Sequence, residues 1–196
     1  MSDAGHLAFV ALGANLADPV AQVRAAHEAL GELPQSTVTR LSSLYRTEPV
    51  GIRGQPDFIN AVAALHTALG AGQLLDALFA VERRFGRLRE FRNAPRTLDL
   101  DLLLYDQLVL DSPRLSLPHP RMHLRAFVLA PLVEIAADCR IPGRGLAAAW
   151  LTAVSRQRIE RLAAWQPERG SVRAPLSPDS SVAASNRVLD TADRER

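Results

Sequence analysis

The chain has 196 residues, a formal net charge of +2, 47% hydrophobic residues and a single cysteine. This length suits one domain with a proper core and some excess, and so mild a charge gives no argument for a nucleic-acid partner. One cysteine excludes an internal disulfide and a cysteine-rich metal site, which fits a reducing compartment. Residues 1–6 lack the basic and apolar regions of a signal peptide, and no apolar run approaches the ~20 residues of a membrane span. We therefore expect a cytoplasmic protein with no membrane partner.

The N-terminal third predicts three strands and a helix. In chain order we expect a buried strand over residues 6–12, a helix over 19–33 and a second strand over 37–46. A loop over 47–56 then leads to a third strand over 57–67. Asp18 suits the N-cap of the helix, with Pro19 at its first position. Alternation in the third strand places Asn60 on the same face as Phe58. An amide beside a ring can bind the edge of a flat heterocycle, but this pattern alone favours an exposed strand residue.

In the rest of the chain we expect an amphipathic helix over residues 72–86 and a fourth strand over 95–105, which turns into a hairpin with residues 108–110. Two further helices over 127–135 and 146–159 and a tail over 166–196 follow. Residues 166–196 are rich in Pro, Ser, Arg and Asp, so they predict a disordered tail after a single domain over residues 1–165. The order strand, helix, strand, strand, helix, strand is typical of the α+β class. It predicts a ferredoxin-like βαββαβ core, a mostly antiparallel sheet with helices on one face.

Asp99 and Asp101 give the strongest chemical signal in the sequence. They alternate with apolar residues in the fourth strand, so both carboxylates point to one face. Their Cα atoms would lie roughly 6.5 Å apart, and two like charges held that close repel unless a cation lies between them. A pair of divalent ions about 3.5–4 Å apart would suit them. The alternative is an amphipathic strand with one wet face, and the strand alone favours neither interpretation.

Basic residues lead into and follow this strand. Four arginines lie between Arg87 and Arg96, and Arg96 offers a rigid donor fork that suits phosphate. A charge run is usually a solvated face, but its position directly before the paired acids favours a phosphate site. His119 lies between two prolines in a second basic segment, which favours a phosphate contact over the structural role of most lone histidines.

Several motifs together resemble the family of 6-hydroxymethyl-7,8-dihydropterin pyrophosphokinase, an enzyme of the folate pathway. They occur in the family's order between Phe9 and about Ile141, and the tail is not covered. The motifs are ALGANL at 11–16, YRTEP at 45–49, QPDFIN at 55–60, RNAPRTLDLD at 92–101 and LSLPHP at 115–120. Asn93 and Ala94 stand where some members carry tryptophan and glycine, and Pro120 stands where some carry an aromatic residue.

The resemblance implies transfer of the β,γ-pyrophosphoryl unit of ATP to the 6-hydroxymethyl oxygen of the pterin, giving AMP. It implies that Asp99 and Asp101 hold two Mg²⁺ ions on the triphosphate and that they are catalytic together with Arg87 and Arg96. The residues that it assigns to the pterin are Thr47, Val50, Phe58, Asn60 and Phe127, with the two aromatic rings stacked on the pterin. The residues that it assigns to ATP are Glu82, Arg89, Arg96, Leu102, Arg114, Ser116, His119 and Arg125.

We also expect a monomer whose arginine loop, between Gly86 and Pro95, closes over ATP and excludes water. Two other interpretations stay open. A ferredoxin-like nucleic-acid binder would need stacked aromatic residues on its central strands; sparse aromatic residues and the acidic pair argue against it. An inactive relative that keeps only the fold is a further alternative, which the intact aspartates, Arg96, His119 and Asn60 argue against.

Overall fold

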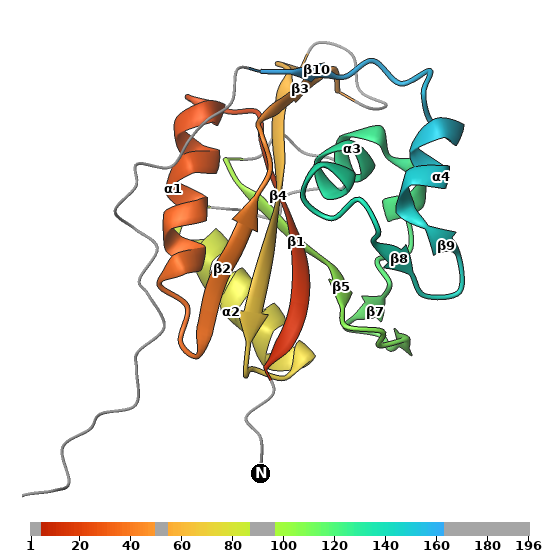
Figure 1. Cartoon of the computed structure of the whole chain (residues 1–196). Helices are drawn as coiled ribbons and strands as arrows, with labels where there is room; N and C mark the ends of the chain where they lie inside the picture. Colours follow the sequence, from red (N-terminus) through yellow and green to blue (C-terminus); the bar gives the residue numbers. More distant parts are fainter. Residues whose placement is uncertain (1–4, 50–54, 87–96, 163–196) are drawn as a thin grey trace, which may run out of the picture.

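The computed structural model describes residues 5–49, 55–86 and 97–162. The elements in chain order are β1 (His6–Ala14), α1 (Pro19–Gly31), β2 (Ser36–Leu41), β3 (Tyr45–Thr47), β4 (Phe58–Thr67), α2 (Ala71–Arg84), β5 (Asp99–Tyr105), β6 (Leu110–Asp111), β7 (Ser116–Leu117), a short 3-10 helix η1 (Met122–Leu124), α3 (Ala126–Ile135), β8 (Arg140–Ile141), β9 (Gly145–Leu146), α4 (Ala147–Ala153) and β10 (Glu160–Arg161) (Figure 1).

A six-stranded sheet forms the centre of the molecule, in the order β10-β3-β4-β1-β5, with β2 also paired to β4. The pairings within it are antiparallel. β1 pairs with β4 along its whole length, from His6 opposite Thr67 to Ala14 opposite Ile59. With α1 after β1 and α2 after β4, this arrangement confirms the predicted α+β class and ferredoxin-like order of strands.

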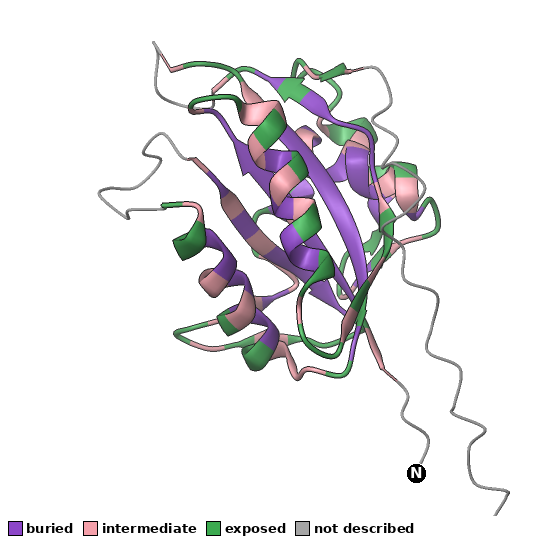
Figure 2. Cartoon of the chain, turned by 90° about the vertical axis from the view of Figure 1, so that its left-hand side faces the viewer, coloured by how far each residue is buried: buried purple, intermediate pink, exposed green. Residues whose placement is uncertain are grey.

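Helices cover both faces of the sheet, which extends the prediction of helices on one face. α1 and α2 contribute Leu30 and Leu78 to one apolar cluster, and α3 contributes Leu129 to a second cluster on the opposite face (Figure 1). Figure 2 shows the strands largely buried, with the exposed residues of the helices turned outward. Because Ala63 faces the first cluster and Val62 the second, β4 is a near-continuous apolar run rather than a strand with one wet face.

The helix that begins at Pro19 is confirmed together with its cap. Asp18 has extended backbone and its carboxylate accepts a hydrogen bond from the N–H of Ala21 at 3.0 Å. The predicted strand over 37–46, in contrast, is divided into β2 and β3. Between them the Ser42 hydroxyl accepts the N–H of Val62 at 2.9 Å, so a side chain replaces a backbone partner and interrupts the ladder.

β5 carries a bulge that the sequence pattern does not reveal. Phe9 lies opposite Leu104 and Val10 opposite Leu102, which leaves Leu103 as the extra residue. As a result Leu102 packs in the cluster under α1 and α2, whereas Leu104 packs in the cluster under α3. The alternating leucines 98, 100, 102 and 104 of the predicted strand therefore do not all share one face, because the bulge reverses the faces after Leu102.

The C-terminal part departs further from the predicted elements. β6 pairs with β7 and not with β5, so the predicted hairpin after Tyr105 is wrong; Asp106 has a positive φ, and it bonds β1 instead, since its N–H donates to the carbonyl of Leu7 at 2.8 Å. The helix predicted over 146–159 is only α4, Ala147–Ala153. The chain then extends, and β10 pairs with β3 instead. The predicted tail over 166–196 lies outside the described residues. No helix within the described ranges is long and apolar enough to cross a membrane.

Candidate functional site

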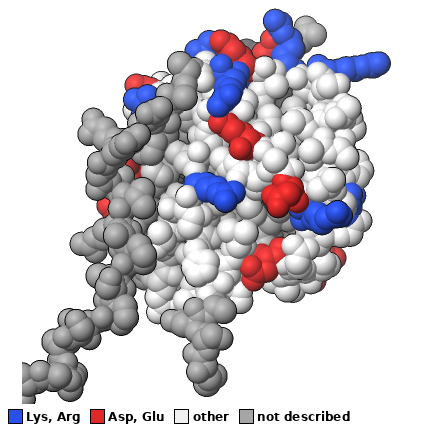
Figure 3. All heavy atoms as spheres, viewed as in Figure 1, with Lys and Arg blue, Asp and Glu red and all other residues white. Residues whose placement is uncertain are grey.

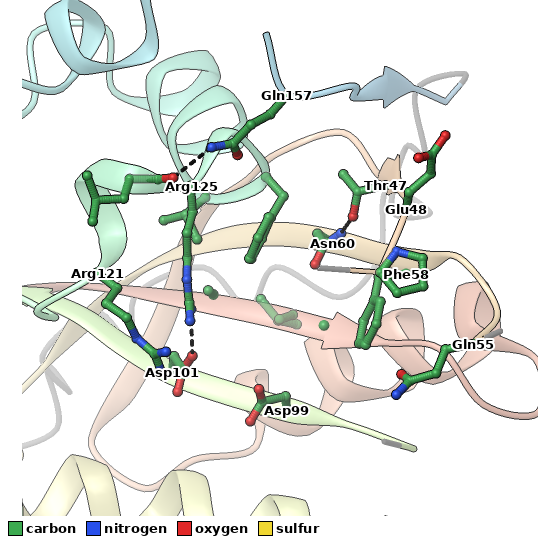
Figure 4. A pocket seen from close by; sticks show the side chains of 17 residues that line it. Thr47, Glu48, Gln55, Phe58, Asn60, Asp99, Asp101, Arg121, Arg125 and Gln157 are labelled. Atoms are coloured by element: carbon green, nitrogen blue, oxygen red, sulfur yellow. Dashed lines mark hydrogen bonds and ion pairs between the residues drawn. The ribbon is translucent and has the colours of Figure 1, made fainter. Parts of the chain in front are cut away.

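A cavity of about 460 Å³ lies on the α3 side of the sheet, within the range of small-molecule sites. β1, β3, β4, β5, η1, α3 and the segment after α4 all contribute to its lining (Figure 4). It brings together many of the residues that the sequence analysis assigned to substrate or metal. These are Thr47, Phe58, Asn60, Asp99, Asp101, Arg125 and Phe127.

The floor of the cavity is a row of residues across three strands. Gly13 of β1 lies opposite Asn60 of β4 on one side and opposite Asp99 of β5 on the other. A Cβ atom at Gly13 would lie 3.4 Å from the Asn60 Oδ1 atom, so the missing side chain leaves the floor open. Asn60 and Asp99 are therefore two strand spacings apart, roughly 10 Å, and Figure 4 shows both side chains directed into the same space.

The acidic end of the cavity is formed by Asp99 and Asp101. Both line it, so the prediction that they share one face is confirmed. The Asp101 Oδ2 atom lies 3.9 Å from the His119 Nε2 atom and 3.9 Å from an Arg125 guanidinium nitrogen, distances longer than a hydrogen bond. The Asp101 side chain is 39% exposed. Two carboxylates with oxygen atoms facing a hollow are the donor set that Mg²⁺ prefers, so these residues fit that ion.

His119 is held in one tautomer at the edge of this acidic end. Its Nδ1 atom accepts the N–H of Arg121 at 3.3 Å, so the neutral ring carries its proton on Nε2, the atom that faces Asp101. Burial, together with the charges of Arg125 and Arg121, lowers the pKa of His119 to about 4, although Asp99 acts in the opposite direction. His119 is therefore a neutral N–H donor at pH 7.

The opposite end of the cavity is aromatic and amide-bearing. Asn60 is buried and its Nδ2 atom donates to the Thr47 Oγ1 atom at 2.9 Å. Thr47 lies opposite Phe58 in the β3–β4 pairing. The guanidinium carbon of Arg125 lies 5.4 Å from the ring centre of Phe127, a cation–π contact. Arg125 therefore connects the acidic end of the cavity with its aromatic end.

His119, at the edge of the cavity, and four further residues that the sequence analysis assigned to ATP are not in the lining. Glu82 is 2% exposed, and its carboxylate accepts the N–H of Leu100 at 2.7 Å. The Leu102 side chain is in the core; its N–H points to the same edge of β5 as that of Leu100, so only its backbone can meet a ligand. Arg114 pairs with Asp76 of α2 at the surface, and the Ser116 hydroxyl donates to Asp111 at 2.9 Å. Their roles toward ATP stay predictions.

The remaining predicted residues, Val50, Arg87, Arg89 and Arg96, lie outside the described residues, as does most of the arginine loop. Other cavity residues were missed by the sequence analysis, namely Glu48, Gln55, Arg121 and Gln157. Arg121 follows the Pro-His-Pro segment directly, a signal that could have identified it. Gln157 has no such signal, because only the fold brings it beside η1 and α3.

Charged side chains are scattered over the face of the molecule drawn in Figure 3, with arginine and acidic groups interspersed. A protein that tracks a nucleic-acid backbone presents a basic stripe or patch. The visible, described part of this face has no continuous patch of that kind, so it offers no support for the nucleic-acid interpretation.

Comparison with known proteins gives consistent matches over the same segments. The family model described as 7,8-dihydro-6-hydroxymethylpterin-pyrophosphokinase matches residues 9–137. A Pseudomonas aeruginosa protein named 2-amino-4-hydroxy-6-hydroxymethyldihydropteridine pyrophosphokinase is 48% identical over 154 residues, covering 79% of this chain and 95% of that protein. Proteins of the same name from Haemophilus influenzae and Bacillus subtilis are 45% and 42% identical, over 69% and 66% of this chain and 84% and 78% of theirs.

Solved structures share the fold. The HPPK-DHPS protein of Plasmodium falciparum, crystallised with pterin and p-hydroxybenzoate, superposes with a TM-score of 0.62 at 11% identity, covering 80% of this chain and 45% of that one. A triple mutant of that protein with pteroate gives a TM-score of 0.59 at 13% identity, over 78% of this chain and 44% of that one. This chain therefore spans less than half of those proteins. Together with the family model and the close relatives, these matches show that the chain belongs to the 7,8-dihydro-6-hydroxymethylpterin-pyrophosphokinase family.

Proposed function

We propose that this chain transfers the pyrophosphoryl group of ATP to 6-hydroxymethyl-7,8-dihydropterin, giving AMP and the pterin diphosphate in folate biosynthesis. Membership of the family supports this reaction. The observation that carries it is the row Asn60–Gly13–Asp99, which places an amide and a carboxylate on opposite sides of an open floor. Such a floor suits a flat heterocycle at one end and a charged group-transfer centre at the other.

The pterin binds at the aromatic end in this proposal. Phe58 and Phe127 offer flat apolar surfaces to the two faces of the ring system, and both line the cavity. Asn60 offers its amide to the edge of the heterocycle, oriented by the hydrogen bond to Thr47. Val50, outside the described residues, is the remaining predicted pterin contact.

ATP binds so that its phosphates reach the acidic end. Asp99 and Asp101 would hold two Mg²⁺ ions there, and magnesium, when bound, neutralises the negative charge that spreads over the phosphate oxygens. Within the described ranges no group of three or more His, Cys, Asp or Glu side chains gathers in a way that could hold a metal. This suits an ion that takes most of its ligands from phosphate and water.

Other groups of the chain contribute donors and positive charge around the phosphates. His119 presents a neutral N–H and Arg125 a guanidinium on the side of Asp101, and Arg121 adds a second guanidinium to the lining. We expect Arg87, Arg89 and Arg96, outside the described residues, to add further charge. Phosphoryl transfer depends chiefly on positioning and on such stabilisation of charge.

The chemical step is a direct displacement. The hydroxymethyl oxygen of the pterin forms a bond to the β-phosphorus of ATP, while the bond from that phosphorus to the oxygen bridging to the α-phosphate breaks. The electron pair leaves with that oxygen on AMP, and the hydroxyl proton is released. No side chain of this chain forms a covalent intermediate in the proposal.

The experiment that tests the proposal is incubation of the purified chain with ATP, Mg²⁺ and 6-hydroxymethyl-7,8-dihydropterin, followed by separation of the nucleotides. We expect one AMP for each pterin diphosphate, and no AMP when the pterin is left out. ADP as the product, or AMP release independent of the pterin, would overturn the proposal. Light scattering after gel filtration tests the predicted monomer, and cell fractionation tests the predicted cytoplasmic location.

A further inference from the structure

The segment after α4 forms one border of the cavity, although it lies beyond residue 137, where the family model ends. We call residues 155–162 the C-terminal clasp. In Figure 1 the chain leaves α4 and crosses to β10, which lies beside β3. The clasp thereby connects the α3 side of the cavity with β3, two walls that are far apart in the sequence.

At its first end the clasp is bound to the main chain around the start of α3. The Gln157 Oε1 atom accepts the N–H of Ala126 at 2.9 Å. The Gln157 Nε2 atom donates to the carbonyl of Leu124 at 2.8 Å (Figure 4). Ala126 is the first residue of α3, whose N-cap residue, Arg125, makes no side-chain capping bond. Gln157 therefore satisfies an N–H that has no partner inside the helix.

The two main-chain groups that Gln157 bonds flank Arg125 and directly precede Phe127, and both of these residues line the cavity. Leu124 directly precedes Arg125, and Ala126 lies between Arg125 and Phe127. Arg125 lies toward Asp101 and is stacked over the Phe127 ring. Because Gln157 bonds both an N–H and a carbonyl of this turn, it fixes the direction in which the side chains of Arg125 and Phe127 leave the backbone.

At its other end the clasp is bound to β3. Glu160 lies opposite Arg46 and Arg161 opposite Tyr45, and the N–H of Leu162 donates to the carbonyl of Leu44 at 2.9 Å. The Arg161 guanidinium also bonds the Glu134 carboxylate at 2.7 Å. Tyr45 is two residues before Thr47, so this end of the clasp is anchored beside the Thr47–Asn60 pair.

From this geometry we infer that Gln157 is a positioning residue of the pterin site, which holds Phe127 and Arg125 at a fixed distance from Thr47 and Asn60. The inference rests on the proposed function for its substrate. Gln157 acts through the main chain of η1 and α3 and takes no part in the chemistry. Its loss should therefore weaken binding of the pterin, whose ring needs two walls at a set separation, far more than it affects folding.

The test compares Gln157→Leu, which removes both hydrogen bonds at similar volume, with Gln157→Glu, which keeps an acceptor for Ala126 but loses the donor to Leu124. Arg156→Ala, at the exposed neighbouring position, is the matched control. We expect the KM for the pterin to rise about tenfold in Gln157→Leu, the order that a lost net hydrogen bond gives, and by less in Gln157→Glu. The control should keep the wild-type KM, and all three melting temperatures should stay within about 3 °C of wild type.

A second readout does not depend on turnover. Amide hydrogen exchange of residues 124–128 should accelerate about tenfold in Gln157→Leu and stay unchanged in Arg156→Ala. A wild-type KM in Gln157→Leu, with normal exchange at 124–128, would overturn the inference while leaving the proposed function intact. A wild-type chain that makes no AMP would overturn the proposed function instead, and the exchange measurement would still decide whether Gln157 holds the turn.

Discussion

Glu82 gives the sharpest prediction, because its carboxylate is buried and is bound to the strand that carries the acids. It is 2% exposed and accepts the N–H of Leu100 at 2.7 Å, between Asp99 and Asp101. A hydrogen bond to a charged group contributes about 1.5–3 kcal/mol to stability, and a buried N–H that loses its partner keeps its desolvation cost. We therefore expect Glu82→Ala to lower the free energy of unfolding by about 2–3 kcal/mol.

For a chain of this size such a loss lowers the melting temperature by about 4–12 °C. Glu82→Gln keeps an uncharged oxygen acceptor and should cost about 1 kcal/mol. Because β5 orients both aspartates, the turnover of folded Glu82→Ala should also fall about 10- to 100-fold. Urea unfolding followed by circular dichroism gives the stability, and AMP formation per folded molecule gives the activity.

Glu28→Ala serves as the control for these measurements, since it makes the same substitution at an exposed position of α1. It should change stability by no more than about 0.5 kcal/mol. If Glu82→Ala unfolded at the same urea concentration as this control, the bond to Leu100 would not be what holds β5 in place.

Further predictions concern the paired aspartates, Asn60 and Glu134 of α3. Asp99→Ala and Asp101→Ala should each lower kcat by more than about 100-fold while the circular dichroism spectrum stays that of wild type; near-normal AMP formation by both would refute the metal assignment. Asn60→Ala should raise the KM for the pterin at least about tenfold and leave the KM for ATP within about twofold, measured by varying one substrate at a time. Burial opposes ionisation of Glu134, but hydrogen bonds from Ser43 and Tyr45 and the charge of Arg161 outweigh it and hold its pKa below the ordinary 4.5. The stabilisation is then complete above pH 4.5 and is lost as the pH falls through the lowered pKa, so the melting temperature of Glu134→Gln should fall less than that of wild type between pH 7 and pH 3.

The sequence predicted the parts of the fold that depend on local patterns. Asp18 before Pro19 marks a helix start by capping chemistry alone, and alternation is enough to place Asp99 and Asp101 on one face. The cap is decided within a few residues, and the alternation holds for the two acids because the bulge in β5 comes only after Leu102.

Features that depend on distant partners could not be predicted in this way. The bulge at Leu103 arises from the pairing of β5 with β1, and nothing in the run of leucines distinguishes that residue. The division between β2 and β3 depends on the Ser42 hydroxyl meeting Val62. Likewise, the pattern that predicted a long helix after residue 146 contains no sign that Arg161 will pair with Tyr45.

The candidate site shows the same difference between features set by local patterns and features set by distant partners. Motif resemblance identified the residues at both ends of the cavity, but it could not separate those that face the hollow from those that support it. Glu82 lies on the apolar stripe of α2 and supports β5, and Gln157 reaches the cavity only because the chain returns from α4 to β3.

The most direct test of the paired carboxylates is calorimetric binding of a non-hydrolysable ATP analogue, with and without Mg²⁺, to the wild-type chain and to the double variant Asp99→Asn, Asp101→Asn. We predict that wild-type binding depends strongly on Mg²⁺ and that the double variant binds weakly whether or not the ion is present. Equal wild-type affinity with and without Mg²⁺, or a double variant that keeps the full magnesium dependence, would contradict the account.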